Sequence, residues 1–396
     1  MFASFRGRFA APFFLCCAAL ASWLAPAWAQ TQGVTKAEVV IGSLQDLSGP
    51  LTPLGVHFRN AIRMRLEEVN EQGGIHGRKV RLVVEDTGYD PRRAVLAARK
   101  LIEQDRVFAV LGNLGSVVVN ATMPAFLDAG IPHLFPAAPQ ENTYFPRHPL
   151  KFALHPAYSV STPLAARQLI RDNGWRRIGV LYQDDDYGLD VLRGMEDLAR
   201  ESGQPLCERA AYKRGATDLS SQVARLKAAG CDAVVLGTVV RETIAAQGAA
   251  RKIGWNVPML VTVAGYTAQV PQLGGAVTEG LYGVVPVPHP YAEGANQALA
   301  TWLAAYRKRF EAEPVTWAVL GYVSADILVR ALEKAGPDLT TAALVKALET
   351  TDRPRDFFGN PPYRLSAEDH LASRAARVAQ IRNGRWELLG DLIEAR

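Results

Sequence analysis

The sequence predicts an α/β fold built from two doubly wound, Rossmann-like modules, and two observations support this prediction. Short runs of β-branched and apolar residues alternate with longer runs of helical periodicity, which is typical of parallel strands connected by helices. The alternation occurs between residues 38 and 128 and begins again after residue 170. Each series is therefore expected to form its own sheet with helices on both faces.

The first series predicts a βαβαβ unit. Apolar residues recur at helical spacing from Phe58 to Val69, and Gly73-Gly74 provides the stop signal. Asp90 and Pro91 supply an N-cap and a proline in the first turn of a second helix. The expected strands are residues 38–44, 79–86 and 107–112.

The second series repeats this rhythm. Its expected strands are residues 176–183, 205–212 and 231–237, and its expected helices are residues 188–202 and 218–230. A largely helical region follows from about residue 296 to 346, and the chain closes with a hairpin that turns on Asn383-Gly384. No flexible linker separates the two series, so we expect several short connections between the modules.

The first 29 residues have the layout of a secretory signal peptide. Arg6 and Arg8 precede an uncharged apolar run over residues 9–24, and the small residues of Ala27-Trp28-Ala29 follow it. We expect cleavage after Ala29 and export to the periplasm. Nothing later in the chain is as long or as apolar, so no membrane insertion is expected after cleavage.

Charge and cysteine content restrict the class of protein further. The mature chain has 42 basic and 39 acidic residues, because the leader removes two of the 44 arginines and lysines. This near balance gives no basic stripe for nucleic acid. Cys207 and Cys231 are the mature cysteines. A bond between them is allowed in an oxidising compartment, but a strand is expected between the two that they adjoin, so we expect free thiols.

The sequence lacks the usual signatures of an enzyme. It has no three-glycine dinucleotide fingerprint, no phosphate-binding Gly-Lys-Ser/Thr loop and no Gly-x-Ser-x-Gly elbow, and its seven histidines show no metal-ligand spacing. Asp184-Asp185-Asp186 resembles the start of a calcium loop, but Leu189 stands where that loop needs glycine. We therefore expect no catalysis, no cofactor and no metal.

Ser116 is a candidate binding residue. The strand at 107–112 runs into Asn113-Leu114-Gly115-Ser116, and a helix follows. Free backbone N–H groups at a helix N-terminus can hold an anionic or carbonyl oxygen. Serine is also an ordinary helix N-cap, and this motif alone leaves both interpretations open.

Several longer runs resemble the branched-chain amino-acid-binding (Leu/Ile/Val) family of type I periplasmic binding proteins. These runs are VVIGSLQDLSGPLTPLG, EQGGIHGRKVRLVVEDTGYDPRRAV, VFAVLGNLGS, IPHLFPAAP and DDDYG, and they span most of the mature chain in order. The resemblance implies two lobes joined by three hinge crossings near residues 156, 286 and 357. Residues 36–156 plus 287–356 would form the N-terminal lobe, and residues 157–286 plus 357–396 the C-terminal lobe.

The resemblance also implies a function. Such proteins close on a small molecule and present it to the membrane permease of an ABC transporter, so we expect a periplasmic substrate-binding component of an importer. The alternative is a sensor subunit that reports ligand occupancy to a membrane receptor. The candidate ligand-binding positions carried over from the family, together with the neighbouring Arg241, are Leu114, Gly115, Ser116, Ala137, Ala138, Pro139, Tyr158, Tyr187, Val239, Arg241 and Val263.

The departures from the family pattern bear on the ligand. Pro139 replaces a carboxylate-binding threonine and offers no N–H, and Tyr158 and Val263 stand where ammonium-binding acids are expected. A buried ammonium without a carboxylate partner costs several kcal/mol. We therefore expect a carboxylate, amide or aromatic ligand rather than a branched-chain amino acid. Leucine binding would need an acid from elsewhere, such as Asp46, Asp86 or Asp326.

Overall fold

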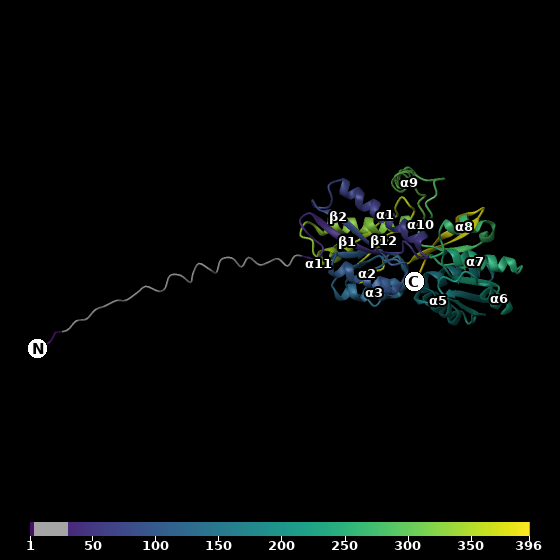
Figure 1. Ribbon diagram of the computed structural model, residues 1–396. Coiled ribbons are helices and arrows are strands. Elements are labelled where there is room, and N and C mark those ends of the chain that lie inside the picture. Colours follow the sequence, from purple (N-terminus) through teal and green to yellow (C-terminus); the bar gives the residue numbers. More distant parts are fainter. Residues whose placement is uncertain (4–30, 396) are drawn as a thin grey trace.

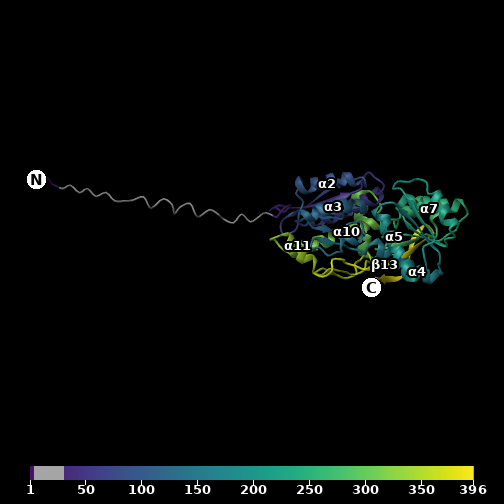
Figure 2. The same ribbon diagram turned by 90° about the horizontal axis from the view of Figure 1, so that it is seen from below.

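The computed structural model describes residues 1–3 and 31–395, and residues 31–395 form two lobes that lie side by side (Figures 1 and 2). One lobe contains a five-stranded sheet in the order β2-β1-β3-β4-β5. The other contains a seven-stranded sheet in the order β14-β13-β10-β9-β8-β6-β7. The expected α/β fold with two doubly wound lobes is confirmed. The predicted leader falls mainly in residues 4–30 and so lies outside the described residues.

The first lobe begins with the first strand–helix series. Its parallel strands are β1 (Glu38–Gln45), β2 (Lys79–Asp86), β3 (Ala109–Leu111), β4 (His133–Leu134) and β5 (Lys151–Phe152). The intervening helices are α1 (Thr52–Glu71), α2 (Pro91–Glu103), α3 (Ser116–Asp128) and η1 (Glu141–Thr143). β1 is buried almost throughout, because it lies between β2 and β3 and its run is apolar.

Later helices complete the first lobe. They are α9 (Gln297–Phe310), α10 (Thr316–Ala335) and α11 (Thr341–Leu348), which together form the expected helical region. α10 packs along α1, as Figure 1 shows. Gly321 permits this close approach, because a Cβ there would lie 2.3 Å from the Phe58 carbonyl oxygen.

The second lobe contains the second series and the C-terminal hairpin. Its strands are β6 (Ile178–Gln183), β7 (Arg209–Tyr212), β8 (Ala233–Gly237), β9 (Met259–Val261), β10 (Tyr282–Val285), β13 (Ala375–Arg382) and β14 (Arg385–Glu394). Its helices are α4 (Tyr158–Asn173), α5 (Asp186–Ser202), α6 (Ser220–Ala228), α7 (Val240–Lys252), α8 (Gln269–Gly274) and η2 (Gly275–Thr278). The predicted hairpin is confirmed, with Asn383 and Gly384 both at positive φ between β13 and β14.

The chain passes from one lobe to the other between β5 and α4 and again between β10 and α9. The third crossing was expected near residue 357, but the chain stays with the first lobe beyond that point. β11 (Asp352–Arg353) pairs with β12 (Tyr363–Arg364), and residues 370–372 still extend the first sheet. There the Ala153 N–H donates to the His370 carbonyl at 2.9 Å. The chain then joins the second sheet at β13, and the full division of residues between lobes stays a prediction.

Cys207 and Cys231 form a disulfide bond, with Cα atoms 5.8 Å apart, so the expectation of free thiols is wrong. The strand order behind that expectation is right, because β6 lies between β7 and β8. The bond nevertheless crosses β6 over Gly179, where an added Cβ would lie 2.9 Å from the Cys231 sulfur and 3.4 Å from the Cys207 sulfur. The missing side chain at Gly179 leaves room for the bridge.

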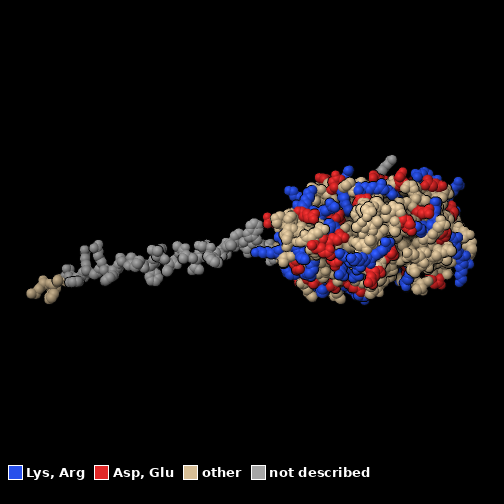
Figure 3. Space-filling view, turned by 90° about the horizontal axis from the view of Figure 1, so that it is seen from above, with Lys and Arg blue, Asp and Glu red and all other residues tan. Residues whose placement is uncertain are grey.

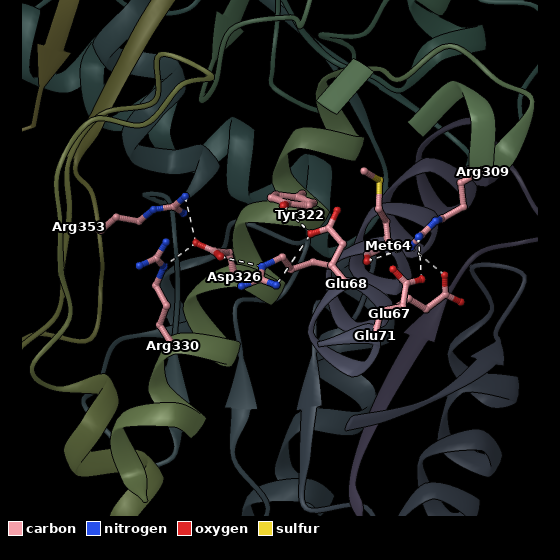
Figure 4. Close-up of polar contacts among 10 residues, drawn as sticks. Met64, Glu67, Glu68, Glu71, Arg309, Tyr322, Asp326, Arg330 and Arg353 are labelled. Atoms are coloured by element: carbon pink, nitrogen blue, oxygen red, sulfur yellow. Dashed lines mark hydrogen bonds and ion pairs between the residues drawn. The ribbon is translucent and has the colours of Figure 1, made fainter. Parts of the chain in front are cut away.

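A buried ion cluster fastens α10 to α1 and to the segment after α11 (Figure 4). Asp326 lies 2.8 Å from Arg65, 2.9 Å from Arg330 and 3.2 Å from Arg353. Burial alone would raise the pKa of Asp326, but the three guanidinium groups hold that pKa below its usual 3.8. Nearby, Arg309 of α9 pairs with Glu67 and Glu71 of α1 in a more exposed position (Figure 4).

The exposed surface carries charges of both signs. Figure 3 shows basic and acidic side chains interspersed over one face of the two lobes. Within residues 1–3 and 31–395, no helix is long and apolar enough to cross a membrane.

Candidate functional site

The first turn of α3 presents backbone donors at the C-terminal edge of the first sheet. Gly115, at φ 96°, is the N-cap residue, and Ser116 is the first helical residue and is only 2% exposed. The N–H groups of Ser116, Val117 and Val118 have no hydrogen-bond partner among the described residues. The Ser116 hydroxyl does not cap the helix, so the ordinary capping interpretation is wrong. This turn has the donors that an anionic oxygen requires.

The bend at Ala137-Ala138-Pro139 lies beside this turn. Ala137 pairs with Leu114, and the Gly115 N–H donates to the Ala137 carbonyl at 3.2 Å. The Pro139 carbonyl in turn accepts the N–H of Tyr158, the first residue of α4, at 2.9 Å. The two carried-over segments of the first lobe therefore contact each other and the start of the second lobe. Ala138 is fully buried.

Two of the predicted positions, Tyr158 and Tyr187, are buried tyrosines of the second lobe. The rings of Tyr158 and Tyr187 pack edge to face, with centroids 4.8 Å apart. The Tyr187 hydroxyl donates to the Thr238 carbonyl at 3.1 Å and lies 2.5 Å from the Thr262 hydroxyl. Burial raises the pKa of Tyr187 and Tyr158, so both phenols stay neutral.

Tyr89 is a contact between the lobes that the sequence did not reveal. It follows β2 in the first lobe, and its ring lies against Gly115, where an added Cβ would be 2.4 Å away. From the second lobe, the Gln183 side chain donates to the Tyr89 hydroxyl at 3.4 Å, and the Arg214 guanidinium lies 5.1 Å from the ring centroid. The sequence does contain one sign of this role: Tyr89 comes just after a parallel strand. In doubly wound sheets, ligands bind at the carboxyl ends of such strands.

The three acids named as alternatives for binding an ammonium already have partners within the protein. Asp46 accepts the N–H groups of Gly49 and Leu51, and Asp86 accepts the Ser48 hydroxyl. Asp326 is held in the arginine cluster described above. None of the three has been left free for a ligand.

Glu242, in the first turn of α7, is a further acid that the sequence did not single out. Its side chain is 1% exposed, and neither carboxylate oxygen has a hydrogen-bond partner among the described residues. Two groups stabilise its negative charge: the N-terminal end of α7 and the Arg241 guanidinium, 3.6 Å away. Burial raises the pKa of Glu242, and Arg241 opposes that shift. Arg241 itself is 60% exposed, the arrangement of a surface arginine at a helix start.

The remaining predicted positions, Val239 and Val263, are both buried. Val239 precedes α7 as its N-cap residue. Val263 lines a cavity of about 30 Å³ at the junction of the lobes, together with Ala137 and Pro139. His155 and Trp317 line the same cavity. The structure therefore brings Ala137, Pro139 and Val263 together at one cavity.

The comparisons with known proteins agree with this architecture. A family model described as periplasmic binding protein matches residues 38–385. Leu/Ile/Val-binding protein homolog 7 from Brucella abortus (strain 2308) is 27% identical over 329 residues, which cover 80% of this chain and 82% of that protein.

Solved structures show the same fold. The fatty acid ABC transporter substrate-binding protein from Thermomonospora curvata has a TM-score of 0.82 and 27% identity, covering 92% of this chain and 95% of that one. A solute-binding protein of an R. palustris ABC transporter, in complex with benzoate, has a TM-score of 0.78 and 18% identity, covering 89% and 96%. The chain therefore belongs to the periplasmic binding protein family, as a two-lobed member of the type I fold related to the Leu/Ile/Val-binding proteins.

Proposed function

We propose that this protein is the periplasmic substrate-binding component of an ABC importer and that it binds the carboxylate of a small molecule between its lobes. The main observation in support is the first turn of α3, where three backbone N–H groups and the Ser116 hydroxyl have no partner in the described part of the chain. A carboxylate accepts several such bonds and is further favoured by the positive end of the helix dipole. The role involves no catalysis.

The rest of the site favours a ligand without an α-ammonium group. From the second lobe, the rings of Tyr158 and Tyr187 would suit an aromatic or apolar body. Glu242, which acts electrostatically on Tyr187 and has no hydrogen-bond partner among the described residues, already has Arg241 and a helix start beside it. Fatty acid and benzoate, named for two structural relatives, are carboxylates of this kind. Amides and other aromatic compounds would meet the same groups.

Closure of the lobes would trap the ligand and form the surface that a membrane permease recognises. Contacts that span the lobes in the structure, such as Gln183 with Tyr89 and Gln269 with the Pro53 carbonyl, are suited to stabilise a closed form. A signal peptide at residues 1–29 would deliver the protein to the periplasm.

A thermal-shift screen tests the proposed ligand class. The panel contains fatty acids, aromatic acids, short dicarboxylates, amides and amino acids. A ligand at 100 times its dissociation constant stabilises the fold by about 2.7 kcal/mol, which a shift in Tm would show. We expect stabilisation by at least one carboxylate that lacks an α-ammonium. If amino acids alone stabilise the protein, the proposed ligand class is wrong.

A further inference from the structure

The cavity at the junction of the lobes has polar atoms that the proposed carboxylate site does not use. It lies where the chain passes between the lobes, and its lining comes from both lobes and from these passages. The residues of the passages that line it are Ala153, Leu154, His155, Pro156, Val284, Pro286, Ala375 and Ala376. Ala137, which pairs with Leu114 beside the α3 turn, also lines it. The cavity therefore adjoins the proposed carboxylate site.

Two side chains that line this cavity carry buried polar atoms without partners. His155 is 8% exposed and Trp317 is 2% exposed. Neither ring nitrogen of His155 has a hydrogen-bond partner among the described residues, and neither does the indole Nε1 of Trp317. An unsatisfied buried polar group costs about 1–3 kcal/mol, so two such side chains at one cavity require an explanation.

The other polar groups of the lining are already engaged. The hydroxyls of Thr143, Ser161 and Ser324 each donate to a backbone carbonyl. These hydroxyls can still accept a hydrogen bond, but their protons are used. Among the lining side chains, the free donors are therefore the single N–H of the neutral His155 and the N–H of Trp317, and the second ring nitrogen of His155 is a free acceptor. These groups can bind an oxygen that both accepts and donates, or a carbonyl oxygen that accepts.

The size and polarity of the cavity restrict what it can hold. A volume of about 30 Å³ is roughly that of two water-sized positions. Most of the remaining lining is apolar, including Phe58, Phe135 and Leu320, and it offers no countercharge. Burial lowers the pKa of His155 to about 3, so the imidazole is neutral at periplasmic pH. A small uncharged group fits these conditions and a charged group does not.

We propose that this cavity is a subsite for an uncharged hydroxyl or carbonyl group of the ligand, bound by His155 and Trp317 at the end remote from the carboxylate. This inference rests on the proposed function, because the carboxylate at α3 fixes the other end. The ligand would then be a carboxylic acid with a second, neutral polar group, of which a hydroxylated aromatic or aliphatic acid is an example.

Paired probes test the subsite by isothermal titration calorimetry. The pairs are benzoate with 4-hydroxybenzoate and hexanoate with 6-hydroxyhexanoate, which differ in reach. In the wild type, we expect the hydroxylated member of at least one pair to bind about five- to tenfold more tightly than its parent. His155→Phe and Trp317→Phe each keep a ring and remove the nitrogen atoms. Both should bring that ratio close to one, with parent-acid affinity changed by less than about threefold.

Trp302→Phe serves as the matched control, because Trp302 is also a buried tryptophan whose Nε1 has no partner among the described residues, but it does not line the cavity. It should keep the wild-type ratio. Thermal melts identify a variant that fails to fold, and the second ring variant then decides the result. A ratio that is equal in wild type and ring variants overturns the subsite and means that the cavity holds water only. If no acid of the panel binds wild type, the proposed carboxylate ligand falls, and the subsite falls with it.

Discussion

Two buried polar regions of the first lobe differ in whether their groups are paired. Asp326 lies among three guanidinium groups, and each of its oxygens has a partner. In the first turn of α3, three backbone N–H groups and the hydroxyl of the buried Ser116 have no partner among the described residues. We expect the paired region to contribute to stability, and the unpaired region to keep its donors available for the proposed ligand.

The largest expected effect is a loss of stability at the paired region. Asp326→Ala should lower the free energy of unfolding by about 3–5 kcal/mol, because the buried Arg65 and Arg353 lose their nearest counterion. They keep only the more distant acids Glu68, at 3.9 Å, and Asp356, at 3.5 Å. Urea denaturation measures this loss. Glu71→Ala, at a 65% exposed acid that pairs with Arg309, is the control and should cost less than about 1 kcal/mol. Equal costs for the two variants would mean that burial of the cluster is unimportant.

The contribution of Asp326 should also depend on pH in a defined direction. Its pKa in the folded protein lies below the usual 3.8, so its stabilisation is fully present above pH 3.8. It is lost as the pH falls through the folded pKa. The difference in unfolding free energy between wild type and Asp326→Ala should therefore shrink at acidic pH. A difference that grows as the pH falls would contradict the assigned pairing.

The disulfide bond is a second element that we expect to affect stability and not ligand affinity. The bonded cysteines are separated by 24 residues in sequence, and loop closure of this size stabilises a fold by about 3 kcal/mol. The double variant Cys207→Ser/Cys231→Ser should lose roughly that amount in chemical denaturation. Its ligand affinity should not change, because both cysteines precede their strands, β7 and β8, and so lie at the opposite edge of the parallel strands from the end where β6 leads into α5 and Tyr187. A large loss of affinity without a loss of stability would be incompatible with this division.

Ser116→Ala should show the opposite pattern. Binding of a carboxylate should weaken by about 0.5–3 kcal/mol, depending on the charge that the hydroxyl meets. The unfolding free energy should change by less than about 0.5 kcal/mol, because Gly115 and not Ser116 is the N-cap residue. Ser220→Ala, at the exposed first residue of α6, is a matched control that should change neither quantity. Unchanged affinity in Ser116→Ala would remove the serine from the proposed site.

The sequence was sufficient for the architecture because apolar periodicity reports which residues are buried. Both strand–helix series follow from it. The hairpin follows from a different local signal, the Asn383-Gly384 turn. Contacts between residues remote in sequence are a different matter. The Cys207–Cys231 bond depends on the missing side chain of Gly179, and strand order alone gives no sign of it.

The residues of the candidate site also fall into two groups: those that local sequence features predict and those that depend on contacts with remote segments. The α3 turn was found because a strand, a glycine and a serine at a helix start are local features. Tyr89, His155 and Glu242 matter only through neighbours from other segments of the chain. His155, for example, lines a cavity with Trp317, a residue of α10. Burial and the lack of partners at such positions become visible only once these segments are placed together.

Calorimetry of the wild-type protein with leucine, isoleucine and valine, beside carboxylic acids that lack an α-ammonium, tests the central claim most directly. A zwitterion loses water from both charged ends when the lobes close, and only its carboxylate meets free donors at α3. A tyrosine ring offers an ammonium about 0.5–2 kcal/mol, less than the cost of burying it unpaired. We expect no binding of the three amino acids at micromolar concentrations and detectable binding of at least one such acid. Micromolar affinity for leucine would contradict the claim and would assign the ammonium to Glu242.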